Sequence, residues 1–344
     1  MYYRYPILTK KAYKDSFRYK NIFQILPYEE EFNLELADFH FVSVLEINIE
    51  ELFKCVDKSI NIELVFSKKR ELLESGVEKI NLSEARALIH FDYYINYAKS
   101  IVLGLLSLFT LFEHFDYPEE TSNAWFTEIP PEPKGMIVKW GKKWLPINKS
   151  QIEKFSTAQP FNKIEEINPL EYYKTVGLGH NKIKFPSDIL SKLDMFFNME
   201  IEVREVINSS IIYFMHANHI KEDFPSLAIV SLVNSMENLV NYEHKNSPVE
   251  KCDECGQNRF RITRKFNNFI DEHLEGYYSR KEIKKMIGDI YSKRSKIVHT
   301  GKLYESEKFK PIWEGSFLDS NLDLEVIISV TRIAINSWMK KYCT

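Results

Sequence analysis

The chain has 344 residues, of which 44% are hydrophobic and 14% aromatic. This composition supports a large buried core and excludes an intrinsically disordered protein. The net charge of −3 excludes a polycation that coats nucleic acid through overall charge. The few scattered cysteines exclude a disulfide framework and indicate a reducing compartment, and the first residues do not show the charged-then-apolar order of a secretory signal. We therefore expect a cytoplasmic protein; the cysteines are Cys55, Cys252, Cys255 and Cys343.

The first part of the chain alternates between strand and helix patterns. Apolar residues at every second position predict strands at 32–36, 45–49 and 60–66. Residues 83–114 predict one long, largely buried helix. Its uncharged core, 100–112, is shorter than the roughly 20 apolar residues that cross a bilayer, so no membrane span is expected.

Prolines interrupt the chain after this helix, and residues 135–146 then predict a hairpin that turns at Gly141 and the two lysines after it. The glycine-bearing stretch at 176–182 predicts a domain boundary, which we place between residues 185 and 186. Its two glycines do not follow a clear strand and lack a third glycine, so a nucleotide-binding loop is not expected.

Residues 186–344 have helical periodicity throughout. Modest loops separate the helices, which favours an antiparallel bundle. The predicted fold class is therefore α+β: a mixed α/β N-terminal domain, 1–185, of unknown role, followed by an all-α helical domain, 186–344. The expected helices are 189–220 (one or two), 224–242, 260–274, one around residue 290, and 322–342.

The helix around residue 290 has a charged residue within its apolar stripe. Arg294 lies eleven residues after Ile283, which at about 100° per residue puts both on nearly the same side. A guanidinium keeps its proton, so Arg294 needs a carboxylate, carbonyls, a phosphate or a wet interface. Gly301 predicts the end of the helix, with His299 in or just after the final turn. The stripe consists of Ile283, Met286, Ile287, Ile290 and Ile297.

The string Arg294-Ser-Lys-Ile-Val-His299-Thr-Gly301 resembles the R-x4-6-H signature of HEPN domains, particularly the Apea-like branch. The resemblance covers about the last 140 to 160 residues. It implies a helical bundle that acts as a metal-independent, dimeric ribonuclease in toxin–antitoxin or phage-defence systems, and it leaves an antitoxin or sensor partner open. The segment 231–239 is similar to the family's acidic helix, so Glu237 is expected to face Arg294 across the bundle. Ser295 departs from the family, because many active members have Asn, Asp or His after the arginine.

The implied chemistry is RNA transesterification, in which the ribose 2′-hydroxyl attacks the adjacent phosphate. Arg294 would bind the phosphate, His299 would transfer protons, Glu237 would orient Arg294, and Ser295 would contribute a minor polar contact. One histidine per chain leaves one proton transfer unassigned, which predicts a homodimer through the helical domain. The alternative is a non-catalytic RNA-binding or dimerisation module, and Ser295 favours it.

The segment 251–302 is basic, with 13 Lys/Arg against 7 Asp/Glu. Its partner is expected to be an anion, and RNA fits the resemblance. Aromatic residues are interleaved with these charges and either stack on single-stranded RNA or belong to the core, which is the commoner fate. They are Phe260, Phe266, Tyr277, Tyr278 and Tyr291.

No cofactor is required by this chemistry. Cys252 and Cys255 have the spacing and following glycine of half a zinc site, which His244, Cys343 or a second protomer would complete; the alternative is a plain loop between helices. His216 and His219 share a helix face but lack a carboxylate set, so a metal is not expected there.

Overall fold

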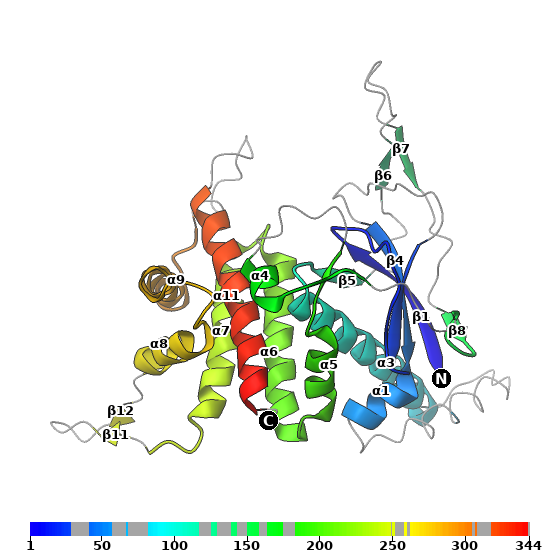
Figure 1. Ribbon diagram of the computed structural model, residues 1–344, viewed down its shortest axis with the longest axis horizontal. Helices are drawn as coiled ribbons and strands as arrows, with labels where there is room; N and C mark the ends of the chain where they lie inside the picture. Colours follow the sequence, from blue (N-terminus) through cyan, green and yellow to red (C-terminus); the bar gives the residue numbers. More distant parts are fainter. Residues whose placement is uncertain are drawn as a thin grey trace. The chain divides into compact units, whose positions relative to one another are not determined.

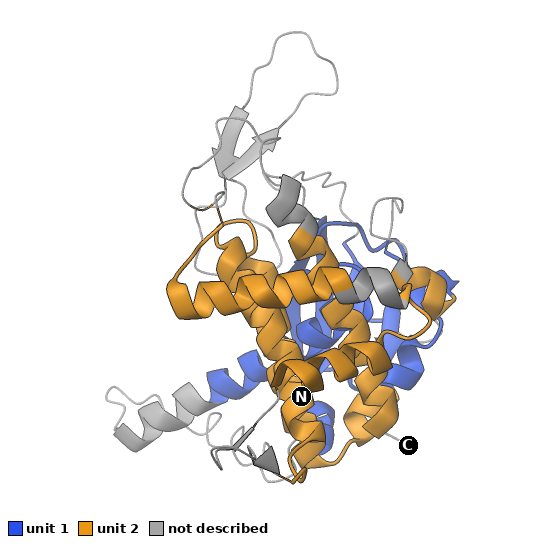
Figure 2. Cartoon of the chain, turned by 90° about the vertical axis from the view of Figure 1, so that its left-hand side faces the viewer, with its two compact units in different colours: residues 1–167, 177–193 blue, residues 168–176, 194–344 orange. Residues whose placement is uncertain are grey.

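The computed structural model describes part of the chain and resolves it into two compact units (Figures 1 and 2). Unit 1 is Met1–Ile167 with Gly177–Leu193, and unit 2 is Asn168–Val176 with Asp194–Thr344. Each unit is described by itself below. The two units are defined by contacts and do not test whether the chain has two independently folding domains. The domain boundary expected between residues 185 and 186 therefore stays a prediction. The described residues are 1–28, 41–56, 67, 82–116, 125–128, 139–142, 150–157, 164–174, 183–248, 250–251, 258–259, 262–304, 307 and 318–342.

Unit 1 contains a six-stranded antiparallel sheet in the order β2-β3-β4-β1-β5, with β8 also paired to β1. The central strand β1 pairs along its whole length with β4, while β5 and β8 pair with opposite ends of its other edge. The alternation at residues 45–49 is confirmed as strand up to Asn48, and Ile49 begins helix α1 (Ile49–Val56). The strands predicted at 32–36 and 60–66 lie outside the described residues. The sheet strands are β1 (Tyr2–Thr9), β2 (Phe17–Tyr19), β3 (Phe23–Pro27), β4 (Phe41–Asn48), β5 (His114–Asp116) and β8 (Ser150–Ile152).

The long helix of unit 1, α3, spans Leu82–Phe109 and is buried along its apolar run. The prediction that it reaches residue 114 is wrong by five residues. The Thr110 hydroxyl donates to the Leu106 carbonyl (2.7 Å) and accepts the Phe112 amide (3.2 Å), so the chain turns there and enters β5. Among the described residues, no helix is both long and apolar enough to cross a membrane.

The shorter elements of unit 1 include a two-stranded ladder of β6 (Trp125–Glu128) and β7 (Lys139–Lys142). Gly141 lies inside β7, opposite Phe126. The turn predicted at Gly141 and Lys142 is therefore wrong, because both residues pair with an earlier strand. β9 (Glu166–Ile167) pairs in parallel with β10 (Phe185–Pro186). Helix α5 (Ile189–Asn198) follows, and its residues from Asp194 onward belong to unit 2.

Unit 2 is helical, which confirms the α+β class for the whole chain (Figure 1). Helix α7 is central and packs against α6, α8, α9 and α11. Its predicted apolar stripe is confirmed: Ile229, Leu232, Val233, Met236, Leu239 and Val240 are all buried. The elements are α4 (Pro169–Lys174), α6 (Ile201–Ile220), α7 (Pro225–Glu243), β11 (Glu250–Lys251), β12 (Asn258–Arg259), α8 (Ile262–His273), α9 (Arg280–Thr300) and α11 (Leu318–Tyr342).

Helix α9 ends as the sequence predicts. Gly301 has φ 66°, in the left-handed region that glycine adopts without strain, and its amide donates to the Ile297 carbonyl at 3.0 Å. His299 therefore belongs to the last turn of α9.

Candidate functional site

A polar cluster lies between α7 and α9 in unit 2. Arg294 donates from Nη2 to Glu237 Oε2 (2.8 Å) and to Asn234 Oδ1 (3.1 Å). The Tyr291 hydroxyl donates to the other Glu237 oxygen, Oε1, at 2.9 Å. Two pairs of residues, each three apart on its own helix, thus face one another, and the structure brings Glu237 and Arg294 together.

The two helices run antiparallel, which explains why these two pairs of residues face each other. The contacts run from Glu237 with Tyr291, through Asn234 with Arg294, to Ser226, whose hydroxyl accepts the Tyr304 amide at 2.9 Å. Residue numbers fall on α7 as they rise on α9 and its following loop. Side chains three apart lie on one helix face, so a single register aligns both pairs.

The cluster is half-buried. The side chains of Arg294 and Glu237 are 19% and 17% exposed, so water screens their ion pair only partly. Burial, together with the hydrogen bond to the Glu237 carboxylate, raises the pKa of Tyr291 to about 12. Tyr291 therefore stays protonated at neutral pH and remains a hydrogen-bond donor to Glu237.

The guanidinium of Arg294 is only partly used. Both of its hydrogen bonds within the described part of the chain come from Nη2. Nε is buried and has no hydrogen-bond partner among the described residues. An arginine has five N–H donors, and the two on Nη1 are thus left to bind an anion or water.

His299 is not part of this cluster. It is exposed, and it lies five residues after Arg294 on the same helix, which at about 100° per residue turns it about 140° away. Within one chain, the imidazole and the guanidinium thus project from different faces of α9. Ser295 is half-buried, and the described residues include no hydrogen-bond partner for its hydroxyl.

Most of the described aromatic side chains of the basic segment make contacts within unit 2. Phe266 is fully buried, and its ring lies 4.7 Å from that of Tyr291, whose hydroxyl is bound to Glu237. Phe266 is therefore a core residue that is not accessible to RNA, whereas the half-buried Tyr291 is engaged within unit 2 by Phe266 and Glu237. Tyr278 is at the surface, where its hydroxyl bonds to Ser329 at 2.9 Å, and Phe260 lies outside the described residues.

The sequence did not assign Asn234 or Tyr291 to the site. Both lie three positions before a residue that it did identify, Glu237 and Arg294 respectively. That spacing is a usable signal, because residues three apart share a helix face.

Four exposed apolar side chains lie where α7 begins and α9 ends. Phe224 and Leu227 belong to the start of α7, Val298 precedes His299, and Leu303 precedes the Tyr304 amide that bonds to α7. They are between 41% and 53% exposed, and we call them the apolar patch.

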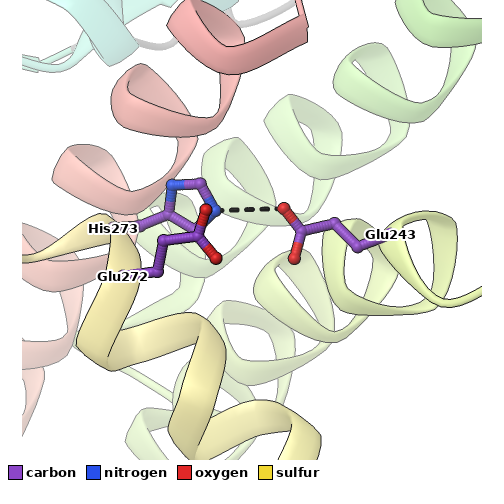
Figure 3. Close-up of side chains that lie close together, drawn as sticks. All are labelled: Glu243, Glu272 and His273. Atoms are coloured by element: carbon purple, nitrogen blue, oxygen red, sulfur yellow. Dashed lines mark hydrogen bonds and ion pairs between the residues drawn. The ribbon is translucent and has the colours of Figure 1, made fainter.

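A second titratable cluster joins α7 and α8 through Glu243, Glu272 and His273 (Figure 3), and Lys341 links it to α11. His273 Nε2 lies 3.1 Å from Glu243 Oε1, and the nearby Glu272 completes a group whose ligand atoms lie within 4.8 Å of one another. Lys341 Nζ bonds to both carboxylates, at 2.9 Å to Glu243 and 2.7 Å to Glu272. Since an ammonium group already bridges the two carboxylates, we interpret the cluster as an ion-pair network that joins three helices, and assign no metal to it.

The expected zinc ligands Cys252, Cys255 and Cys343 lie outside the described residues. His244, the other candidate, has its Nδ1 3.1 Å from the Ser247 hydroxyl. His216 and His219 are both exposed on α6.

Comparison with known proteins gives no relative: no protein-family model matches the chain, and neither a curated protein nor a solved structure is detectably similar to it.

Proposed function

We propose that the protein is a metal-independent endoribonuclease of the HEPN type that acts in the cytoplasm, in a toxin or phage-defence setting. The observation that supports this most is the state of Arg294. It is half-buried, held by Glu237 and Asn234 through one nitrogen, and it has further donors unpaired among the described residues. A guanidinium fixed in this way is suited to the oxygens of a phosphate.

The residues take separate roles in the proposed reaction. Arg294 binds the phosphate and stabilises the negative charge that develops as the 2′-hydroxyl attacks. His299 transfers the proton, as general base for the hydroxyl or general acid for the departing 5′-oxygen. Glu237 orients Arg294 and never contacts RNA, and Ser295 adds a minor polar contact. The products are a 2′,3′-cyclic phosphate and a 5′-hydroxyl.

A second copy of the chain completes the proposed site. One imidazole serves one proton transfer, and His299 projects from a different face of α9 than Arg294. The apolar patch beside His299 offers the surface that a partner would cover, with 49% of both Leu227 and Val298 exposed. In a symmetric dimer across this patch, two copies of His299 share one cleft.

Exposed basic side chains provide the electrostatic attraction for the RNA backbone. Arg264, Lys285, Lys296 and Lys302 are exposed on α8, α9 and the loop after α9. Their contacts to phosphates are independent of sequence, and the affinity they provide falls as salt rises.

The decisive experiment incubates the purified full chain with total cellular RNA in the presence of EDTA. Cleavage is expected for the wild type and for His216→Ala, which removes an exposed histidine from α6, but not for His299→Ala. The products are then tested for 2′,3′-cyclic phosphate ends. Equal cleavage by wild type and His299→Ala would exclude the proposed mechanism.

The alternative function is a non-catalytic RNA-binding or dimerisation module. Ser295 after the arginine and the projection of His299 away from Arg294 favour it. In that case wild type and His299→Ala bind RNA equally and neither cleaves it, with or without EDTA.

A further inference from the structure

We propose that Tyr291 is a positioning residue that prevents Glu237 from pairing with two nitrogens of the Arg294 guanidinium, and so keeps Nη1 open for a phosphate. This inference rests on the proposed function and adds a residue to it. Tyr291 itself contacts neither RNA nor the reacting atoms.

Carboxylates and guanidinium groups tend to pair through two parallel hydrogen bonds, in which both oxygens bind two nitrogens. Such a pair would occupy an edge of Arg294 and neutralise most of its charge. In this structure only Glu237 Oε2 contacts Arg294, at 2.8 Å, while Oε1 accepts the Tyr291 hydroxyl at 2.9 Å. The tyrosine thus directs Oε1 toward itself and away from the second nitrogen that a two-bond pair would use.

Asn234 holds the same nitrogen of Arg294 that Glu237 binds. Its side-chain oxygen accepts from the same nitrogen, Nη2, at 3.1 Å, so both protons of Nη2 are used. The guanidinium is held by one nitrogen against α7. The donors on Nη1 and Nε have no hydrogen-bond partner in the described part of the chain.

The tyrosine is itself held in place. Its ring packs against the fully buried Phe266, with centroids 4.7 Å apart. Its pKa, raised to about 12, keeps the hydroxyl protonated over the range in which a ribonuclease works. A rigid, neutral donor restrains a carboxylate oxygen without adding charge to the site.

The test is Tyr291→Phe, which keeps the ring that packs on Phe266 and removes the hydroxyl. Tyr278→Phe is the matched control, because it removes a tyrosine hydroxyl that bonds to Ser329, outside the cluster. Circular dichroism is used to check that both variants are folded. We expect kcat to fall ~10-fold and KM to rise in Tyr291→Phe, since Arg294 contacts the phosphate in bound RNA and more strongly in the transition state. Both should be unchanged in Tyr278→Phe.

A second measurement uses an RNA oligonucleotide with 2′-O-methyl groups, which binds but lacks the attacking hydroxyl. The slope of log affinity against log salt is expected to be smaller in Tyr291→Phe by about 0.7, the contribution of one phosphate contact in single-stranded RNA. This result is independent of turnover, so it also decides the inference if the protein binds RNA without cleaving it.

A double variant that combines Tyr291→Phe with Glu237→Gln tests whether Tyr291 acts through Glu237. If Tyr291 acts through the Glu237 carboxylate, Tyr291→Phe has no further effect once that charge is gone. An equal loss in both backgrounds overturns the inference, as does a Tyr291→Phe protein that matches wild type in kcat and salt slope. A wild type that neither cleaves RNA nor binds the oligonucleotide refutes the proposed function, and the inference with it.

Discussion

His114 is predicted to make unit 1 sensitive to acid. It is fully buried, with Nδ1 3.1 Å from the Phe112 carbonyl oxygen and Nε2 2.6 Å from the Tyr13 hydroxyl. A carbonyl only accepts, so Nδ1 holds the proton and Nε2 accepts from the tyrosine. The neutral imidazole is thus fully satisfied, and burial lowers the pKa of His114 to about 3.

The magnitude follows from the difference between the folded and unfolded states. An unfolded histidine takes up a proton below pH 6.5, whereas folded His114 does so only near pH 3. Stability from this group is complete above pH 6.5 and is lost as the pH falls between these values, at about 1.4 kcal/mol per pH unit. Lowering the pH from 7 to 5 should therefore cost about 2 kcal/mol.

The assay compares denaturant unfolding of wild type and His114→Gln at pH 7 and pH 5. Glutamine keeps an acceptor for the Tyr13 hydroxyl and cannot titrate, so other groups contribute equally to both proteins. Wild type should lose about 2 kcal/mol more than the variant over this range, and exchange of the amides in β1 and β5 should accelerate in wild type alone. Equal losses in the two proteins would refute the assignment of a buried neutral imidazole.

Three further outcomes follow from the described contacts. Gly301→Ala should lower the free energy of unfolding by about 1 kcal/mol, because the φ of 66° at this position disfavours a side chain. Gly288→Ala, within α9, should raise the free energy of unfolding by about 0.5 to 1 kcal/mol, because nothing lies within 4 Å of the added carbon. Thermal unfolding tests both variants. Burial alone would raise the pKa of Glu243, but hydrogen bonds from the neighbouring histidine and lysine outweigh it and lower that pKa. Its stabilisation is thus present above pH 4.5 and lost as the pH falls further, and Glu243→Gln should reduce that loss in acid unfolding curves. Leu227→Asp should abolish the proposed dimer in sedimentation experiments, whereas Ile212→Asp, at an equally exposed apolar position on α6, should not; a wild-type monomer would contradict the proposed interface.

The sequence was sufficient to predict most of unit 2. The stripe of α7 and the end of α9 depend on local periodicity and on one glycine, both of which are readable from the chain. The need of Arg294 for a polar partner also follows from its permanent charge, and Glu237, which the resemblance put opposite it, supplies a carboxylate. Asn234 and Tyr291 were not assigned to the site because their positions depend on the register between α7 and α9, which non-local packing sets.

The two errors in unit 1 have different physical origins, one local and one from pairing with another segment. Helix α3 stops at Phe109 because a single threonine side chain binds the backbone on both sides of the turn, although the apolar pattern continues. Gly141 is a strand residue because β7 pairs with β6, an interaction that overrides the local preference of glycine for turns.

The first turn of α7 also holds the segment that follows His299, the proposed acid–base residue. The Ser226 hydroxyl accepts the Tyr304 amide and donates to the Glu307 carboxylate, which ties the chain just beyond His299 to the start of α7. The same helix, further along, holds the guanidinium through Glu237. Helix α7 thus holds α9 at Arg294 and the following segment at Tyr304. In the proposed reaction, substitutions at Ser226 should therefore shift the end of α9 and lower turnover, although Ser226 itself does not contact RNA.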